Sequence, residues 1–198
     1  MDVSNAWTIA SYAAAGIALA ACAGMRAFLP LLVIGIAGRL GRFEISEGYQ
    51  WLLSDAALIT FAVAAIAETL ADKIPAVDHA LDAVQLFIKP IVGTIAAAAL
   101  FVHLPPLEAT LLGLVVGGTV ATGVGLAKAK VRLLSSLTTG TMLNPVVSLV
   151  EDVVSAVVAA IAVLVPVLAL ACIVGIVVWG ARRLHRRIRA PGPTGAAL

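Results

Sequence analysis

Charged residues are scarce in this sequence, making up 12% of its 198 residues, against about 25% in soluble globular proteins. Aromatic residues are also few, at 5%, and there are only two cysteines, too few to indicate a disulfide framework. A water-soluble surface is built largely from charged and polar side chains. The shortage of charge therefore excludes a soluble enzyme, a nucleic-acid-binding protein and a disordered linker.

Apolar side chains take the place of charge. Hydrophobic residues account for 62% of the chain, and the mean hydropathy is +1.09. A helix needs about 20 apolar residues to cross the hydrocarbon core of a bilayer. Runs of about this length cover residues 6–24, 51–70, 86–104, 107–127 and 153–179. The sequence therefore predicts an all-α, polytopic transmembrane helix bundle with about five full spans.

Two further apolar segments, residues 27–38 and 133–148, are too short to span. The first contains Pro30, and the second is interrupted at Gly140 and at Asn144-Pro145. Irregular backbone at membrane depth is tolerated only where protein or water satisfies its polar groups. These segments are predicted to be broken or re-entrant helices, with ordinary loops or distorted helix ends as the alternative. Lys89-Pro90 is expected to interrupt the third run in the same way.

Small residues recur every four positions in two of the runs, and a basic residue follows each series. Such a series lies on one helix face and allows two backbones to approach closely. Paired interrupted segments in two halves are typical of repeat-built transporters, so residues 1–181 are predicted to form one domain with halves 6–104 and 107–180. Ala-rich runs also produce such series by chance. The same faces suggest a homo-oligomer. The residues are Gly16, Ala20 and Gly24 before Arg26, and Gly113, Gly117, Ala121 and Gly125 before Lys128.

Arginines are concentrated after the last run, which ends at Trp179. Five of the 13 basic residues lie between Arg182 and Arg189. Because Lys and Arg near the ends of spans favour the cytoplasmic side, residues 182–198 are predicted to be a basic cytoplasmic tail of a multi-pass protein.

Several polar side chains lie within the apolar runs or at their ends. A charge at membrane depth costs several kcal/mol unless it is paired or hydrated, so each is a functional hypothesis. We expect these groups to line a substrate pathway, although solvated loop acids and helix caps are the plainer interpretation. The candidates are Arg26, Glu68, Asp72, Lys89, Lys128, Arg132, Asn144, Glu151 and Asp152.

The candidate acids and bases are predicted to pair inside the protein. Five crossings would place Lys128 and Arg132 on the non-cytoplasmic side, against the usual preference, next to several acids. Buried partners would account for this, since an unpaired buried charge is costly. We therefore predict that Glu68 or Asp72 pairs with Lys128 or Arg132, and that Glu151 closes the network beside Asn144.

Metal binding and catalysis have weaker support. Asp78, His79 and Asp82 could ligate a hard or borderline cation, but their spacing matches no known ligand motif. There is no His-Glu-x-x-His and no Gly-x-Ser-x-Gly motif. We expect no enzyme activity and no cofactor, and a lipid-modifying enzyme would require a carboxylate–metal centre.

Three separated blocks carry a family resemblance. They are CAGMRAFLPLL at 22–32 with AGRLG at 37–41, AETLADKIPAVD at 67–78 with FIKPIVG at 87–93, and KAKVR at 128–132 with NPVVSLVED at 144–152. The chain resembles the uncharacterised membrane family "domain of unknown function 4126", although Lys89 stands where the family pattern has Arg. The resemblance implies a bacterial inner-membrane protein and brings no established activity.

Two functions fit these features. A small transporter or channel for an ion or small polar solute predicts that the charged groups converge on a cavity. A non-transporting membrane scaffold or lipid-binding protein predicts closed ion pairs without a cavity. In both cases the bilayer is the surrounding partner, and no nucleic acid is involved.

Overall fold

The computed structural model describes residues 3–72, 75–139 and 144–166, with residues 168, 171, 173–175, 178–179 and 182 beyond them. The regular structure in this part of the chain is entirely helical, which confirms the all-α prediction. The elements are α1 (Val3–Met25), α2 (Leu29–Arg39), the 3-10 helix η1 (Glu47–Leu53), α3 (Asp55–Ala71), α4 (Pro75–Ala98), α5 (Pro106–Gly113), the π-helical segment η2 (Leu114–Gly118), α6 (Thr119–Thr139) and α7 (Asn144–Leu164).

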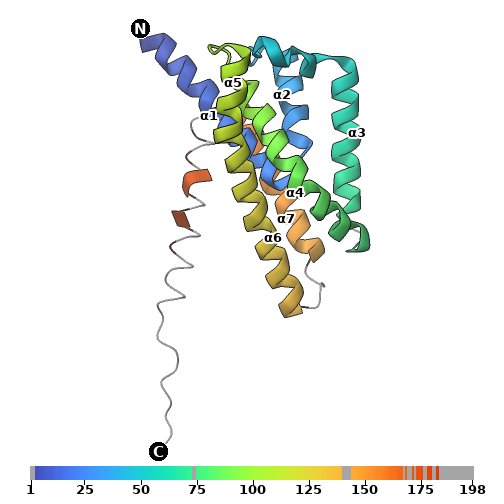
Figure 1. Ribbon diagram of the computed structural model, residues 1–198. Helices are drawn as coiled ribbons and strands as arrows, with labels where there is room; N and C mark the ends of the chain where they lie inside the picture. The colour runs from blue at the N-terminus through green and yellow to red at the C-terminus, as the bar shows by residue number, and fades with distance from the viewer. Residues whose placement is uncertain are drawn as a thin grey trace, which may run out of the picture.

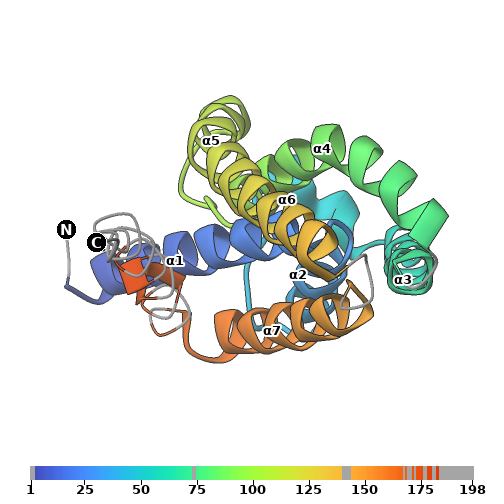
Figure 2. The same cartoon turned by 90° about the horizontal axis from the view of Figure 1, so that it is seen from below.

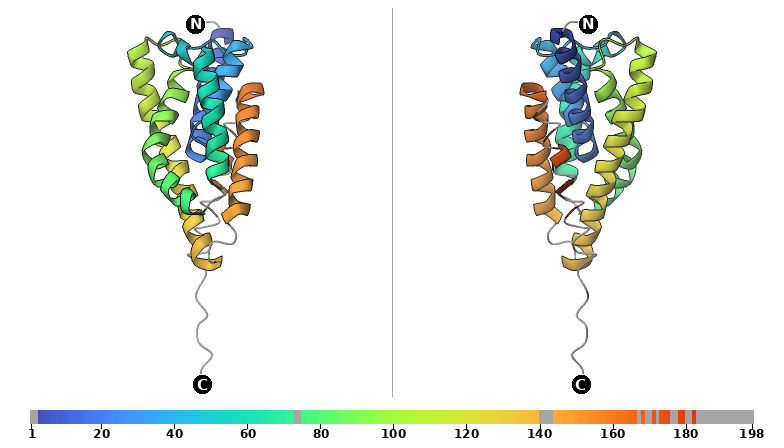
Figure 3. Two further views of the ribbon diagram at one scale, coloured as in Figure 1. Left: turned by 90° about the vertical axis from the view of Figure 1, so that its right-hand side faces the viewer. Right: turned by 90° about the vertical axis from the view of Figure 1, so that its left-hand side faces the viewer.

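The helices form an elongated bundle in which α1 and α2 make a hairpin (Figures 1 and 3). α1 runs into the bundle and α2 returns, so the outer ends of both helices lie at the same end of the molecule. α1 packs against α4, α6 and α7, and α2 packs against α3. Viewed along the bundle, α2 lies between α3, α6 and α7 (Figure 2). The turn of the hairpin, which begins at Arg26, therefore lies inside the bundle.

Two helical stretches in the described residues, Asn5–Met25 and Pro106–Leu133, are long and apolar enough to cross a membrane. They coincide with the predicted runs 6–24 and 107–127, which are thus confirmed as helices of sufficient length. A third is added if η1 and α3, which meet at a 67° bend, count as one span. The described part of the chain therefore holds two or three candidate spans, against the five predicted from the sequence.

The other three predicted spans differ in how much of each the structure describes. The Ser54 hydroxyl accepts a hydrogen bond from the amide of Ala57 at 3.2 Å, so it caps α3 and leaves Trp51 in η1, across the bend. In α4, the apolar stretch among the described side chains is Val84–Ala98, and most side chains of the first turns lie outside the described part. α7 ends at Leu164, and much of the rest of the predicted run 153–179 lies outside the described residues.

The predicted interruption at Lys89-Pro90 is wrong, because α4 continues through Pro90. Proline removes one backbone donor from a helix. The Thr94 hydroxyl donates to the Pro90 carbonyl at 2.8 Å, adding a hydrogen bond at this turn. The predicted break in 133–148 is consistent with α6 ending at Thr139 and α7 beginning at Asn144; residues 140–143 lie outside the described part.

The predicted small-residue faces do bring helices together. Gly117 lies against the backbone of Gly93 in α4, and a Cβ atom added at Gly93 would lie 2.6 Å from the Gly117 carbonyl oxygen. A Cβ atom at Gly24 would lie 2.5 Å from the Ala121 carbonyl oxygen. Such approaches require glycine, since no side chain fits between the backbones. The homo-oligomer and the internal repeat stay predictions.

Replacing Gly117 with Ala should destabilise the protein, because the new methyl group would clash with the α4 backbone. We expect the free energy of unfolding to fall by about 1–3 kcal/mol, measured by thermal unfolding in a mild detergent. Gly123→Ala is the matched control, since nothing lies within 4 Å of a Cβ atom there. Equal unfolding temperatures for the two variants would contradict the close packing.

Candidate functional site

Asp72, at the end of α3, is the centre of a buried group of charges. Its Oδ2 atom lies 2.8 Å from Nη1 of Arg26, 3.4 Å from Nη2 of Arg132 and 4.0 Å from Nζ of Lys128. The three basic residues come from the α1–α2 turn and from α6, and all are buried. The prediction that Asp72 pairs with Lys128 or Arg132 is thus confirmed.

Glu151, on α7, shares the two bases of α6. Its Oε2 atom lies 3.1 Å from Nζ of Lys128 and 3.6 Å from Nη2 of Arg132. Lys128 also donates to the Met25 carbonyl at 3.1 Å, where the end of α1 leaves carbonyls without helical partners. One ammonium group therefore links α1, α6 and α7.

Arg26 connects the α1–α2 turn to α7. Its guanidinium group forms an ion pair with Asp152 and donates to the Ser148 hydroxyl at 3.3 Å. Arg26 is only 2% exposed, whereas the Asp152 side chain is 22% exposed. Asp152 is therefore the most accessible carboxylate among the charges paired here.

These contacts define the charge network, which contains as many acids as bases. Among the described contacts, three carboxylates face three cations, so these six side chains together carry no formal net charge. Neutrality matters because burying an unmatched charge costs several kcal/mol. The members of the charge network are Arg26, Asp72, Lys128, Arg132, Glu151 and Asp152.

The sequence predicts that Glu68, as the alternative to Asp72, pairs with a base of α6, but its described partners are amide groups. Its two oxygens accept hydrogen bonds from the amides of Ala27 and Phe28 at 2.9 and 3.3 Å, and Oε1 also accepts from Nε2 of Gln85 at 2.7 Å. These amides lie at the α1–α2 break, where helical partners are missing. Glu68 thus stabilises the start of α2, where the helix dipole also favours an anion.

A cavity of about 210 Å³ borders the charge network. It lies between the α1–α2 turn, α3 and α7, and its polar lining consists of Arg26, Glu68, Thr69 and Asp152. Leu29, Ala65 and Ala156 complete the wall. We call it the polar cavity. Its volume exceeds the roughly 30 Å³ occupied by one water molecule in the liquid, so it has room for a small solute.

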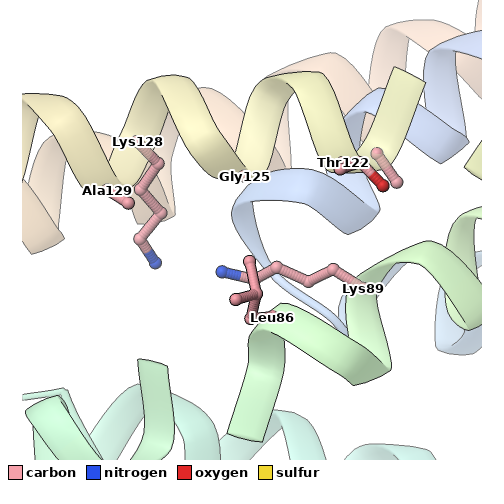
Figure 4. A pocket seen from close by; sticks show the side chains of 7 residues that line it. Leu86, Lys89, Thr122, Gly125, Lys128 and Ala129 are labelled. Carbon is pink, nitrogen blue, oxygen red and sulfur yellow. The ribbon is translucent and has the colours of Figure 1, made fainter. Parts of the chain in front are cut away.

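A second, much smaller cavity lies between α4 and α6. Lys89 and Lys128 extend toward each other from the two helices, beside Gly125 and Thr122 (Figure 4). The cavity measures about 30 Å³, room for about one water molecule. Lys89 is therefore close to Lys128, a member of the charge network defined above.

The structure thus gathers most of the predicted site residues around one place in the bundle. The side chains of Asn144, Asp78, His79 and Asp82 lie outside the described part, although all four residues belong to helices. Among the described residues, no three His, Cys, Asp or Glu side chains form a group that could hold a metal ion. The three candidate ligands Asp78, His79 and Asp82 are not among these described side chains, so the metal site stays a prediction.

Sequence reasoning missed the hydroxyl groups of α7. Ser148 and Ser155 are fully buried, and Ser148 binds Arg26. The two serines and Glu151 and Asp152 between them recur at spacings of three and four residues, which places them on one helix face. That pattern could have identified the inward face of α7.

Comparisons with known proteins identify a family but no activity. Neither the curated proteins nor the solved structures include one that matches the chain. The family described as "Domain of unknown function (DUF4126)" matches residues 13–186, which contain the whole charge network and the lining of both cavities. The chain belongs to this DUF4126 family.

Proposed function

We propose that this protein is a transporter or channel for an ion or small polar solute in the bacterial inner membrane. The observation that carries the proposal is the position of the polar cavity, which directly borders a buried network of six charged side chains. A purely structural network would be expected to exclude solvent. Asp152 instead faces the cavity and remains 22% exposed.

Unused hydrogen-bonding atoms support the same proposal. Within the described residues, Nε of Arg26, Oδ1 of Asp72, Oε1 of Gln85 and Oγ of Ser155 are buried without a hydrogen-bond partner. Buried polar atoms are nearly always satisfied by protein or water. Water or a polar solute beside Arg26 and Asp72 would satisfy the two of these atoms that belong to the charge network.

The helix break at the cavity also suits a transport site. Broken helices in transporters bring backbone groups and helix ends to the substrate. Here the end of α1 and the start of α2 meet at Arg26 and Ala27, next to the polar cavity. Opening the cavity would require exchanging the ion pairs of Arg26 for contacts with a solute, and no chemical step is needed.

Flux measured with purified protein in liposomes tests the proposal. Asp152→Asn should lower the flux of the carried ion or solute about tenfold, since a hydrogen bond to a charged group contributes roughly 1.5–3 kcal/mol. Asp55→Asn, which removes an exposed carboxylate paired with Arg39, is the control and should leave the flux unchanged. The assay covers inorganic cations, inorganic anions and small metabolites. Flux no faster than in protein-free liposomes for all of them would refute the proposal.

A further inference from the structure

The polar cavity continues into an apolar groove between α2 and α3. The groove measures about 350 Å³, more than twice the roughly 150 Å³ cavity that suffices to hold a benzene molecule. Its walls share three residues with the polar cavity, so the two spaces are adjacent. The shared residues are Leu29, Ala65 and Thr69; Leu32, Ala62, Ile66 and Leu70 complete the groove.

The groove opens on an apolar outer face of the bundle. Ile66 and Leu70 on its rim are well exposed, as are Ile59 and Val63 farther up α3. Residues at these spacings share one side of a helix. A continuous exposed apolar face of this kind meets other apolar material, which for a membrane protein is the hydrocarbon of the lipid. A hydrocarbon chain can therefore reach the groove directly from the bilayer.

The polar end of this space favours a cation. Two carboxylates, Glu68 and Asp152, and one guanidinium group, Arg26, contribute to its lining. Both terminal nitrogens of that guanidinium already face Asp72, Asp152 and Ser148. Glu68 receives its described hydrogen bonds from neutral donors, so these bonds add no formal positive charge to the lining. The lining carries one formal negative charge in excess.

We infer that the polar cavity and the groove together bind an amphiphile from the bilayer, with a cationic amine head in the cavity and a hydrocarbon chain in the groove. The head would lie beside Asp152 and Glu68, and the chain would run between Leu32 and Ile66. This ligand goes beyond the small polar solutes of the proposed function, although it uses the same cavity and rests on that site being accessible.

Binding of tritiated dodecylamine to the purified protein in a neutral detergent tests the inference, by scintillation proximity. Unlabelled dodecylamine should displace the label at least tenfold better than dodecanol or dodecyl sulfate, which share its chain but lack the cation. Equal displacement by dodecanol would overturn the cationic head, and stronger displacement by dodecyl sulfate would show that the cavity prefers an anion.

Two test variants and one control variant locate the ligand. Ala62→Phe, which fills the groove away from the charges, should weaken dodecylamine binding about tenfold or more. Ala67→Phe makes the same change at an exposed position of α3 outside both spaces and should bind like the parent. Asp152→Asn should weaken dodecylamine binding and leave dodecanol binding unchanged. Parent-like binding by Ala62→Phe would overturn the inference.

The outcome is separate from that of the flux assay. Flux of a small ion without dodecylamine binding would leave the proposed function standing and remove this inference. Binding without any flux would support the amphiphile site and refute the transporter.

Discussion

Replacing Asp72 with Asn is expected to lower the free energy of unfolding by about 3–5 kcal/mol, the range for removing one partner of a buried ion pair. Its Oδ2 atom lies within 4.0 Å of Arg26, Lys128 and Arg132. Without this carboxylate, the described ion pairs would leave three buried cations facing two acids. The measurement is the unfolding temperature and denaturant midpoint of the purified protein in detergent.

Asp55→Asn is the matched control for Asp72→Asn. Asp55 pairs with Arg39 at 2.5 Å, but its side chain is 82% exposed, and exposed ion pairs contribute about 1 kcal/mol or less. The double variant Asp72→Asn with Arg132→Gln should recover part of the lost stability, because it restores the charge balance of the network. An Asp72→Asn variant as stable as the control would contradict the pairing.

Replacing Glu68 with Ala should cost about 3 kcal/mol or more of unfolding free energy. It would leave the amides of Ala27 and Phe28 and the side-chain amide of Gln85 without their acceptor, and a buried unsatisfied donor costs about 1–3 kcal/mol. The loss would concentrate at the α1–α2 break. Hydrogen exchange of the α2 amides should therefore accelerate more than that of α6.

Glu68→Gln removes the negative charge but keeps a hydrogen-bond acceptor, so it distinguishes the two contributions. The glutamine oxygen can still accept from Ala27, so this variant should recover part of the stability lost in Glu68→Ala. Glu47→Ala, at an exposed position of η1, is the control and should change stability little. If Glu68→Ala unfolds like Glu47→Ala, then Glu68 does not hold the helix break together.

The charge network could be predicted from sequence because charge is so rare in this chain. A buried base must find an acid, and few acids lie at the ends of the apolar runs. That constraint led to Asp72, Lys128, Arg132 and Glu151, which the structure brings together. The two unbroken candidate spans, Asn5–Met25 and Pro106–Leu133, could also be predicted from the sequence, since their apolar runs are nearly free of charge.

Other features depend on contacts that no sequence pattern displays. Glu68 binds backbone amides, and amides are present at every residue, so the pattern of acids and bases cannot reveal that it caps α2. The bend between η1 and α3 lies at Ser54, whose backbone is extended and whose hydroxyl caps α3. Pro90 suggested an interruption, but α4 accommodates it, because packing against α1 and α6 can outweigh a local preference.

The π-helical segment η2 has a consequence for the bases that lie beyond it. An α-helix rotates by roughly 100° per residue, and a π turn contains more residues than an α turn. The side chains after Leu114–Gly118 are therefore turned about the helix axis relative to those of an uninterrupted helix. Shortening this segment by one residue would turn Lys128 and Arg132 by about a quarter of a revolution, away from Asp72. This uncharged segment lies roughly 15 Å from Lys128 along the helix axis. Its length nevertheless determines the direction in which the cations of α6 point, and so whether they reach their acids.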